Sequence, residues 1–167
     1  MKRNGSDRRK FLRNTLTGTG ALAGAATLGL PASAADKGKA TKKVITRDGQ
    51  PLKPDSILSP GIQFGNLLFV SGAGAHDPTT HKVVEGPISN QVRQCLENIK
   101  GVLEAGGSSL DRVLKCNVFL KEIADFQEMN NVYHTFFPTN PPARSTVAVK
   151  DLPGDSPVEI ECIAYVD

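Results

Sequence analysis

The sequence of 167 residues has only three cysteines, and none of them belongs to a Cys-x-x-Cys pair. Cys116 and Cys162 fall on apolar faces of expected strands, and Cys95 lies beside the apolar stripe of an expected helix. This placement favours packing in the core over a disulfide, catalysis or metal binding, because a buried cysteine behaves as a small hydrophobic residue. In an oxidising compartment an odd number of cysteines would leave at least one free thiol or an intermolecular bridge.

The sequence also lacks the commonest signatures of nucleotide and hydrolase sites. It has no Gly-x-x-x-x-Gly-Lys phosphate loop, no Gly-x-Gly-x-x-Gly fingerprint and no Gly-x-Ser-x-Gly elbow. Any catalytic or binding residues of this chain therefore lie outside these short motifs.

A basic surface is missing as well, although the formal charge is +3. Residues 1–35 hold six Lys and Arg residues and one acid. Residues 36–167 hold 14 Lys and Arg residues and 16 Asp and Glu residues, a net charge of −2. Nucleic-acid binding depends on neutralised phosphates, so we expect no nucleic-acid partner.

The N-terminus carries the pattern of an export signal. Arg8-Arg9-Lys10-Phe11-Leu12-Arg13 looks like the twin-arginine motif, an uncharged stretch follows over residues 14–30, and Pro31-Ala32-Ser33-Ala34-Ala35 resembles a small-residue cleavage site. The pattern predicts a signal peptide over residues 1–35, passage through the twin-arginine export machinery, and a soluble periplasmic protein after cleavage. A disordered basic tail and a membrane anchor are the other interpretations, but an anchor needs about 20 predominantly apolar residues.

The rest of the chain reads as one domain over residues 44–167, after a polar, lysine-rich spacer at 36–43. Apolar or alternating runs predict strands at 67–70, 113–120, 144–149 and 158–166. In the last of these, the apolar face is formed by Val158, Ile160, Cys162, Ala164 and Val166. The other face mixes two acids with two large apolar residues, which suggests an interface or a site.

Helical periodicity predicts a helix over residues 89–105, with an apolar stripe of Val92, Leu96, Ile99 and Leu103 that stops at Gly106-Gly107. In the strand at 113–120 we expect Leu114, Cys116, Val118 and Leu120 to share one face.

A second helix is expected to start at Asp125, where Asp125 and Glu128 have capping-box spacing, and to end before the prolines at 138, 141 and 142. Its apolar side is expected to hold Phe126, Met129, Tyr133 and Phe136. The order of elements predicts an α+β domain with two helices on one face of a mixed sheet.

Few polar residues stand out as candidates for chemistry. His76, Asp77 and His81 lie in one turn, where a solvated loop is favoured over a metal site because the spacing matches no known ligand pattern. His134 lies one helical turn after Asn130 and is expected at the surface. Arg144 and Glu159 carry little weight when each is taken alone.

Several motifs together resemble the Rid (YjgF-type) family of imine and enamine deaminases. They are Leu-Leu-Phe-Val-Ser-Gly at 67–72, the helix at 91–105, Asp-Phe-Gln-Glu-Met-Asn-Asn-Val-Tyr at 125–133, and Pro-Ala-Arg-Ser-Thr at 142–146 followed by Val-Glu-Ile-Glu-Cys-Ile-Ala at 158–164. The resemblance covers residues 58–166. It implies the Rid (chorismate-mutase-like) fold, a homotrimer with clefts between subunits, and hydrolysis of 2-imino acids to 2-keto acids and ammonia without metal or organic cofactor.

The resemblance also implies roles for individual residues. The arginine that grips the substrate carboxylate falls on Arg144, and the glutamate that activates water falls on Glu159. The family's helix asparagine falls on Asn130 and its glycine after the core strand on Gly72. Thr146 and Gly72 are expected to offer backbone groups to the water or the imine. The residue types suit this chemistry, because a guanidinium binds a carboxylate with two parallel hydrogen bonds and a glutamate in a cleft can carry a proton.

Two positions depart from the family pattern. Leu58 stands where the family has a tyrosine, and Ala73 stands where it has a glutamine. Both changes remove a polar group near the expected substrate site, and Leu58 favours imines of larger apolar amino acids. A non-catalytic trimer that binds a small carboxylate is therefore the alternative function, and a holdase-like interaction protein is a third.

Overall fold

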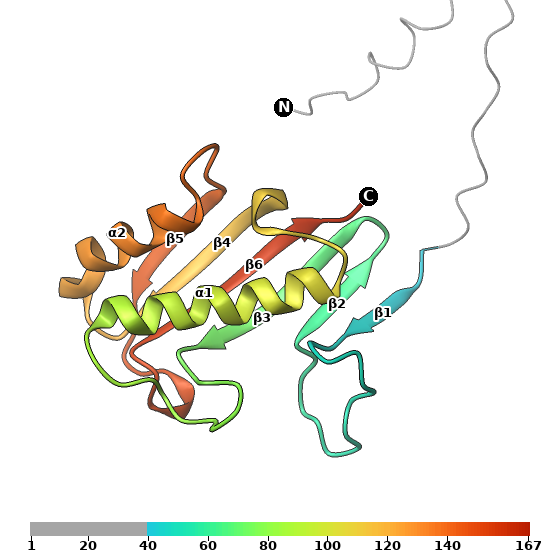
Figure 1. Ribbon diagram of the computed structural model, residues 1–167, viewed down its shortest axis with the longest axis horizontal. Coiled ribbons are helices and arrows are strands. Elements are labelled where there is room, and N and C mark those ends of the chain that lie inside the picture. The colour runs from blue at the N-terminus through green and yellow to red at the C-terminus, as the bar shows by residue number, and fades with distance from the viewer. Residues whose placement is uncertain (1–39) are drawn as a thin grey trace, which may run out of the picture. The chain divides into compact units, whose positions relative to one another are not determined.

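The computed structural model describes residues 40–167, which form a six-stranded sheet with two helices on one of its faces (Figure 1). The expected export signal lies outside the described residues. The strands follow the order β1-β2-β3-β6-β4-β5 across the sheet, and only the β4–β5 pair is parallel. The elements are β1 Lys42–Ile45, β2 Gly61–Phe64, β3 Leu67–Gly74, α1 Ile88–Ala105, β4 Val113–Leu120, α2 Phe126–Phe136, β5 Ala143–Ala148 and β6 Val158–Tyr165. The predicted α+β fold with a mixed sheet is confirmed.

Helix α1 covers β3 and β6 with the predicted stripe. Its four apolar side chains are buried, and the helix ends at Gly106, followed by Gly107 with a φ of +77°. Glycine adopts this left-handed conformation without the steric cost that a Cβ brings, so it terminates the helix. The stripe and its stop signal are confirmed.

Strand β4 differs from the sequence prediction at its first residues. Val113 pairs with Ala164 and Lys115 pairs with Ile163, so Leu114 has no partner on β6 and forms a bulge. The bulge puts Val113 in the core and leaves Leu114 47% exposed. The prediction that Leu114 shares the buried face is therefore wrong, because simple alternation does not hold across a bulge.

Helix α2 begins without the predicted capping box. Asp125 closes a short 3-10 turn in a helical conformation (φ −76°, ψ −5°), whereas a capping residue has extended backbone. Glu128 instead accepts a hydrogen bond from the backbone N–H of Ser89 at 3.2 Å, which ties α2 to the start of α1. Met129 and Tyr133 are buried as predicted, while Phe126 stays 38% exposed.

Two strands, β1 and β2, were not predicted. Each has only four residues, too few for a periodic pattern to emerge. β2 and β3 form a hairpin through a tight turn in which Gly65 has a φ of +61°. β1 pairs with β2 and forms one edge of the sheet, and β5 forms the other.

The side chains of strand β6 alternate between the two faces of the sheet, as the sequence pattern predicts. Val158, Ile160, Cys162 and Ala164, together with Val166 just after the strand, are buried under the helices. Glu159, Glu161, Ile163 and Tyr165 lie on the opposite face, which neither α1 nor α2 covers (Figure 1) and which is called the open face below. Within residues 40–167 no helix is long and apolar enough to cross a membrane.

Candidate functional site

Arg144 extends from the edge strand β5 toward α2, which surrounds its guanidinium group with uncharged groups. One nitrogen donates a hydrogen bond to Oδ1 of Asn130 at 2.6 Å, and another lies 3.8 Å from Sδ of Met129. The guanidinium carbon lies 4.5 Å from the ring centroid of Tyr133 and 5.9 Å from that of Phe126. The predicted pair of Arg144 and Asn130 therefore lies together.

Within residues 40–167 no acidic side chain pairs with Arg144. The ion pairs of residues 40–167 join Lys100 to Glu97, Arg112 to Asp167 and Lys121 to Asp151, and none involves Arg144. A half-buried guanidinium that lacks an acidic partner and retains free N–H donors is suited to bind an anion, and its planar fork matches a carboxylate.

Glu159 lies on the open face, between β3 and β4. Its side chain packs directly over Gly72, where an added Cβ would lie only 2.7 Å from the carboxylate carbon of Glu159. Real Cβ atoms do not approach so closely, so any side chain at position 72 would displace the carboxylate. The structure thus brings Gly72 and Glu159 together and gives a steric reason for the glycine.

The two candidate catalytic residues lie on opposite faces of the sheet. Val158 and Ile160, the neighbours of Glu159, point into the core beneath the helices, so Glu159 points away from them. Arg144 pairs with the buried Cys116 of β4 and contacts α2 on the helical side. A single chain therefore does not join Arg144 and Glu159 in one site.

Thr146 follows Arg144 by two residues and so lies on the same side of β5. Its hydroxyl oxygen is buried and has no hydrogen-bond partner within residues 40–167. The Tyr133 hydroxyl is also buried, and its neighbour is the weakly polar Cys116 thiol. Burial raises the pKa of Tyr133 far above its ordinary value, so this phenol stays protonated.

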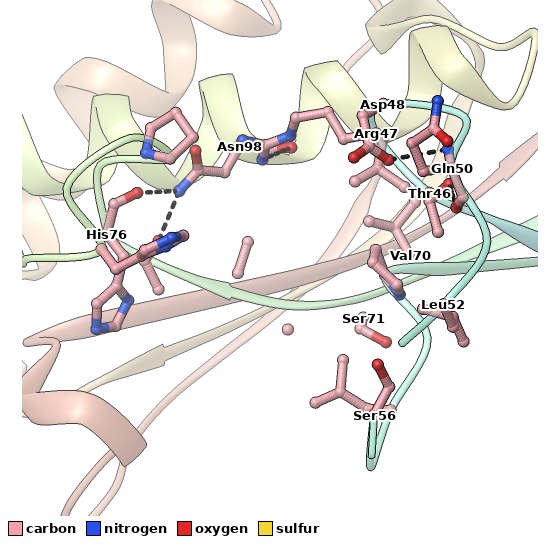
Figure 2. Close-up of a pocket in the computed structure, with 18 of the residues that line it drawn as sticks. Thr46, Arg47, Asp48, Gln50, Leu52, Ser56, Val70, Ser71, His76 and Asn98 are labelled. Carbon is pink, nitrogen blue, oxygen red and sulfur yellow. Dashed lines mark hydrogen bonds between the residues drawn. The ribbon is translucent and has the colours of Figure 1, made fainter. Parts of the chain in front are cut away.

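Leu58 lies in the loop between β1 and β2 and is 60% exposed, next to the almost fully exposed Ile57. The loop and the end of β3 enclose a cleft of about 610 Å³, a volume in the range of small-molecule sites (Figure 2). Leu58, Ala73 and Gly72 line this cleft. The other predicted site residues, Asn130, Arg144, Thr146 and Glu159, do not.

The buried side-chain amide of Asn98 connects the elements that line one side of this cleft. The Asn98 side chain on α1 donates hydrogen bonds to the carbonyl oxygens of Gly74 at 3.0 Å and His76 at 2.8 Å (Figure 2). Arg47 donates to the carbonyl oxygen of Asn98 at 2.8 Å. These polar contacts join the β1–β2 loop, β3 and α1. Sequence reasoning missed Asn98, and its signal was a polar residue between Cys95 and Ile99 on the buried side of the helix.

The turn that contains His76, Asp77 and His81 is held by hydrogen bonds within the turn and by one to Gly154. Nε2 of His76 lies 2.9 Å from the carbonyl oxygen of Gly154, and the Asp77 carboxylate accepts the N–H groups of Thr79 and Thr80. These two backbone hydrogen bonds lower the pKa of Asp77. Among the described residues, no three His, Cys, Asp or Glu side chains gather to form a metal site.

The three thiols are buried and unpaired, which confirms the prediction of core packing. Burial raises the pKa of each thiol, most strongly for Cys95 and Cys162, so none is a thiolate at neutral pH. His134 on α2 is exposed, as expected.

The sequence profile of the family described as Endoribonuclease L-PSP matches residues 49–166. The chain belongs to this family. A RutC family protein of Pyrococcus horikoshii is 48% identical over 124 residues, which are 74% of this chain and 98% of the relative. A protein of Dermatophagoides farinae named 2-iminobutanoate/2-iminopropanoate deaminase is 39% identical over 128 residues, 75% of this chain and 98% of the relative.

A solved structure supports the same assignment. The crystal structure of the YjgF gene product from E. coli superposes with a TM-score of 0.67 at 35% identity, and it covers 74% of this chain and 98% of its own. The predicted Rid family membership and fold are confirmed.

Proposed function

We propose that the protein hydrolyses 2-imino acids to 2-keto acids and ammonia, in clefts formed between the subunits of a homotrimer. One observation carries the proposal: the half-buried guanidinium of Arg144 is held by uncharged groups and forms no ion pair within residues 40–167. An imino acid supplies the carboxylate that this group lacks. The name of the Dermatophagoides relative supports the same reaction.

The placement of Arg144 and Glu159 on opposite faces of the sheet supports the proposed assembly. Only a second copy of the chain can bring a Glu159 to an Arg144, so the complete site requires an oligomer. The open face suits such an interface because large apolar side chains lie exposed across its strands: Phe64, Phe69 and Tyr165. Their burial between subunits would remove apolar surface from water.

Glu159 is the acid and base of the proposed reaction. Water adds to the carbon of the protonated imine while Glu159 takes one of the water's protons, which gives a neutral carbinolamine. Glu159 then returns this proton to nitrogen. The carbon–nitrogen bond breaks, ammonia leaves, and the hydroxyl group gives its proton to Glu159 as the carbonyl forms. Gly72 lets the carboxylate approach, Asn130 holds Arg144, and Gly72 and Thr146 offer backbone groups to the water or the imine.

A second function, binding of a small carboxylate without catalysis, is favoured by one observation. Leu58 and Ala73 line the cleft beside the β1–β2 loop, which Arg144 of the same chain does not line, with apolar groups where the family pattern has polar ones. This leaves Arg144 as a receptor and removes hydrogen-bonding groups that would orient an imine.

A coupled assay separates the two functions. An amino-acid oxidase generates an imine, semicarbazide traps what remains, and the protein is added in increasing amounts. A deaminase lowers the yield of trapped semicarbazone in proportion to its concentration. A pure binding protein leaves the yield unchanged at catalytic concentrations and still binds the keto acid in a titration.

We also propose that the protein is exported to the periplasm through the twin-arginine machinery, with residues 1–35 as the signal. The proposal rests on the pattern of residues 8–35 in the sequence. We propose no nucleic-acid substrate despite the family's name, because residues 36–167 carry a net charge of −2 and no basic run.

A further inference from the structure

We propose that Tyr133 is a positioning residue for Arg144, and that its ring fixes the orientation of the guanidinium group before a ligand binds. The nature of the ligand rests on the proposed function, whereas the contact between the two side chains does not. The guanidinium carbon of Arg144 lies 4.5 Å from the ring centroid of Tyr133. In the other arginine–aromatic pairs found within residues 40–167, this distance is 5.7 to 6.0 Å.

The ring of Tyr133 is itself held from another side. Its centroid lies 4.6 Å from that of Phe137, at an interplanar angle of 38°, and both residues are only 5% exposed. The backbone N–H of Phe137 also donates to the carbonyl oxygen of Tyr133 at 3.1 Å. A ring packed in this way has little freedom, so it offers Arg144 a fixed surface.

The aromatic ring of Tyr133, and not its hydroxyl group, orients the guanidinium group of Arg144. The Tyr133 hydroxyl is buried beside the Cys116 thiol and makes no hydrogen bond to Arg144, so it does not orient the guanidinium group. The face of an aromatic ring attracts a guanidinium group through its quadrupole and stacks on its plane. Phenylalanine at position 133 would retain this interaction, and an aliphatic residue would abolish it.

A positioned arginine binds its ligand more tightly because it loses less conformational freedom on binding. Loss of the ring should therefore weaken binding of a carboxylate and raise KM. It should change kcat little, because the ring contacts the group proposed to bind the carboxylate and not the group proposed to transfer the proton. A purely structural role for Tyr133 would instead lower the amount of folded protein and leave KM unchanged.

The experiment compares Tyr133→Phe and Tyr133→Leu with wild type, and uses Val132→Ala as a control. Val132 is a buried residue of the same helix with no hydrogen bond or ring contact to Arg144. Titration with 2-oxobutanoate gives Kd, and the ¹H–¹⁵N signal of Arg144 Nε reports the ring-current effect of Tyr133. We expect Tyr133→Leu to raise Kd roughly 5- to 30-fold and to shift the Nε signal toward that of a free arginine. Tyr133→Phe and Val132→Ala should retain both values.

A folded Tyr133→Leu protein with the wild-type Kd and the wild-type Nε signal overturns the proposal, and so does a Tyr133→Phe protein as impaired as Tyr133→Leu. If Tyr133→Leu does not fold, Tyr133→Met replaces it, since methionine fills an aromatic cavity more adaptably. If wild type binds no keto acid and hydrolyses no imine, the proposed function fails, and the Nε signal alone then decides the role of Tyr133.

Discussion

The carboxylate of Glu159 rests on the backbone of Gly72, so closely that a methyl group at position 72 would collide with it. This contact joins two residues that are 87 positions apart and lie on adjacent strands. The position of the proposed base therefore depends on the absence of a side chain in β3.

Gly72→Ala tests this dependence. The new Cβ should displace the Glu159 carboxylate and lower kcat/KM for imine hydrolysis by roughly tenfold to a hundredfold, because small misplacements of a reacting group are costly. Gly101→Ala is the matched control, since the atoms nearest to a Cβ there all belong to the flexible Arg47 side chain, which can move aside. Equal activity of the two variants would show that Glu159 needs no free space over position 72.

Arg144→Ala should abolish the grip on the substrate carboxylate. Two charge-assisted hydrogen bonds are lost, each worth about 1.5–3 kcal/mol, so kcat/KM should fall about a hundredfold or more. Arg144→Lys should restore little of this, because an ammonium group lacks the planar fork. Steady-state kinetics of both variants check the expectation, and near wild-type turnover of Arg144→Ala would contradict the assigned role.

Mixing two inactive variants tests whether the site is shared between subunits. Arg144→Ala and Glu159→Gln should each be inactive as homotrimers. Trimers reassembled from equal amounts of both should recover about a quarter of wild-type activity, because that share of the clefts unites an intact Arg144 with an intact Glu159 from different chains. Light scattering establishes the trimer independently. No recovery in properly mixed trimers would argue against a shared cleft.

Leu58→Tyr should shift the substrate preference. The wild-type cleft, with an apolar wall at position 58, should favour imines of leucine or methionine over that of alanine, by a graded factor because hydrophobic pockets discriminate by only about 1–3 kcal/mol per methylene. Tyrosine should move the ratio of kcat/KM values back toward the small imine and leave the trimer intact. An unchanged ratio would mean that Leu58 does not line the substrate site.

Export should depend on the twin arginines and not on total charge. The double substitution Arg8→Lys and Arg9→Lys preserves every charge, yet it should retain the precursor in the cytoplasm because a receptor reads the pair. Cell fractionation and immunoblotting measure the distribution. Normal periplasmic levels of the double variant would refute the twin-arginine assignment.

The helices and the long strands could be predicted from the sequence because the spacing of their apolar residues matches the spacing of their buried positions. The stripe of α1 and the alternation of β6 each bury one face along a regular element, so position along the chain determines the side. The same reasoning failed at Leu114, where a bulge resets the alternation, and at Asp125, where a preceding 3-10 turn sets the backbone. Neither feature has a sequence signature of its own.

The site was predictable only in part. The motif around Arg144 and Glu159 identified both residues, but the opposite faces on which they lie follow from strand pairing. The support of Arg144 by Tyr133 was hidden for a different reason. In the sequence Tyr133 is one apolar member of a helical stripe, and only the packing of β5 beneath α2 reveals what lies against its ring.

The three buried cysteines give the protein built-in reporters of its own opening. Cys95 belongs to α1, Cys116 to β4 and Cys162 to β6, so they sample both layers of the fold. A thiol reagent can reach them only when the core opens, so the rate of labelling measures the frequency of that event. Because all three thiols are buried, the folded protein exposes no thiol that could form an incorrect disulfide in an oxidising environment.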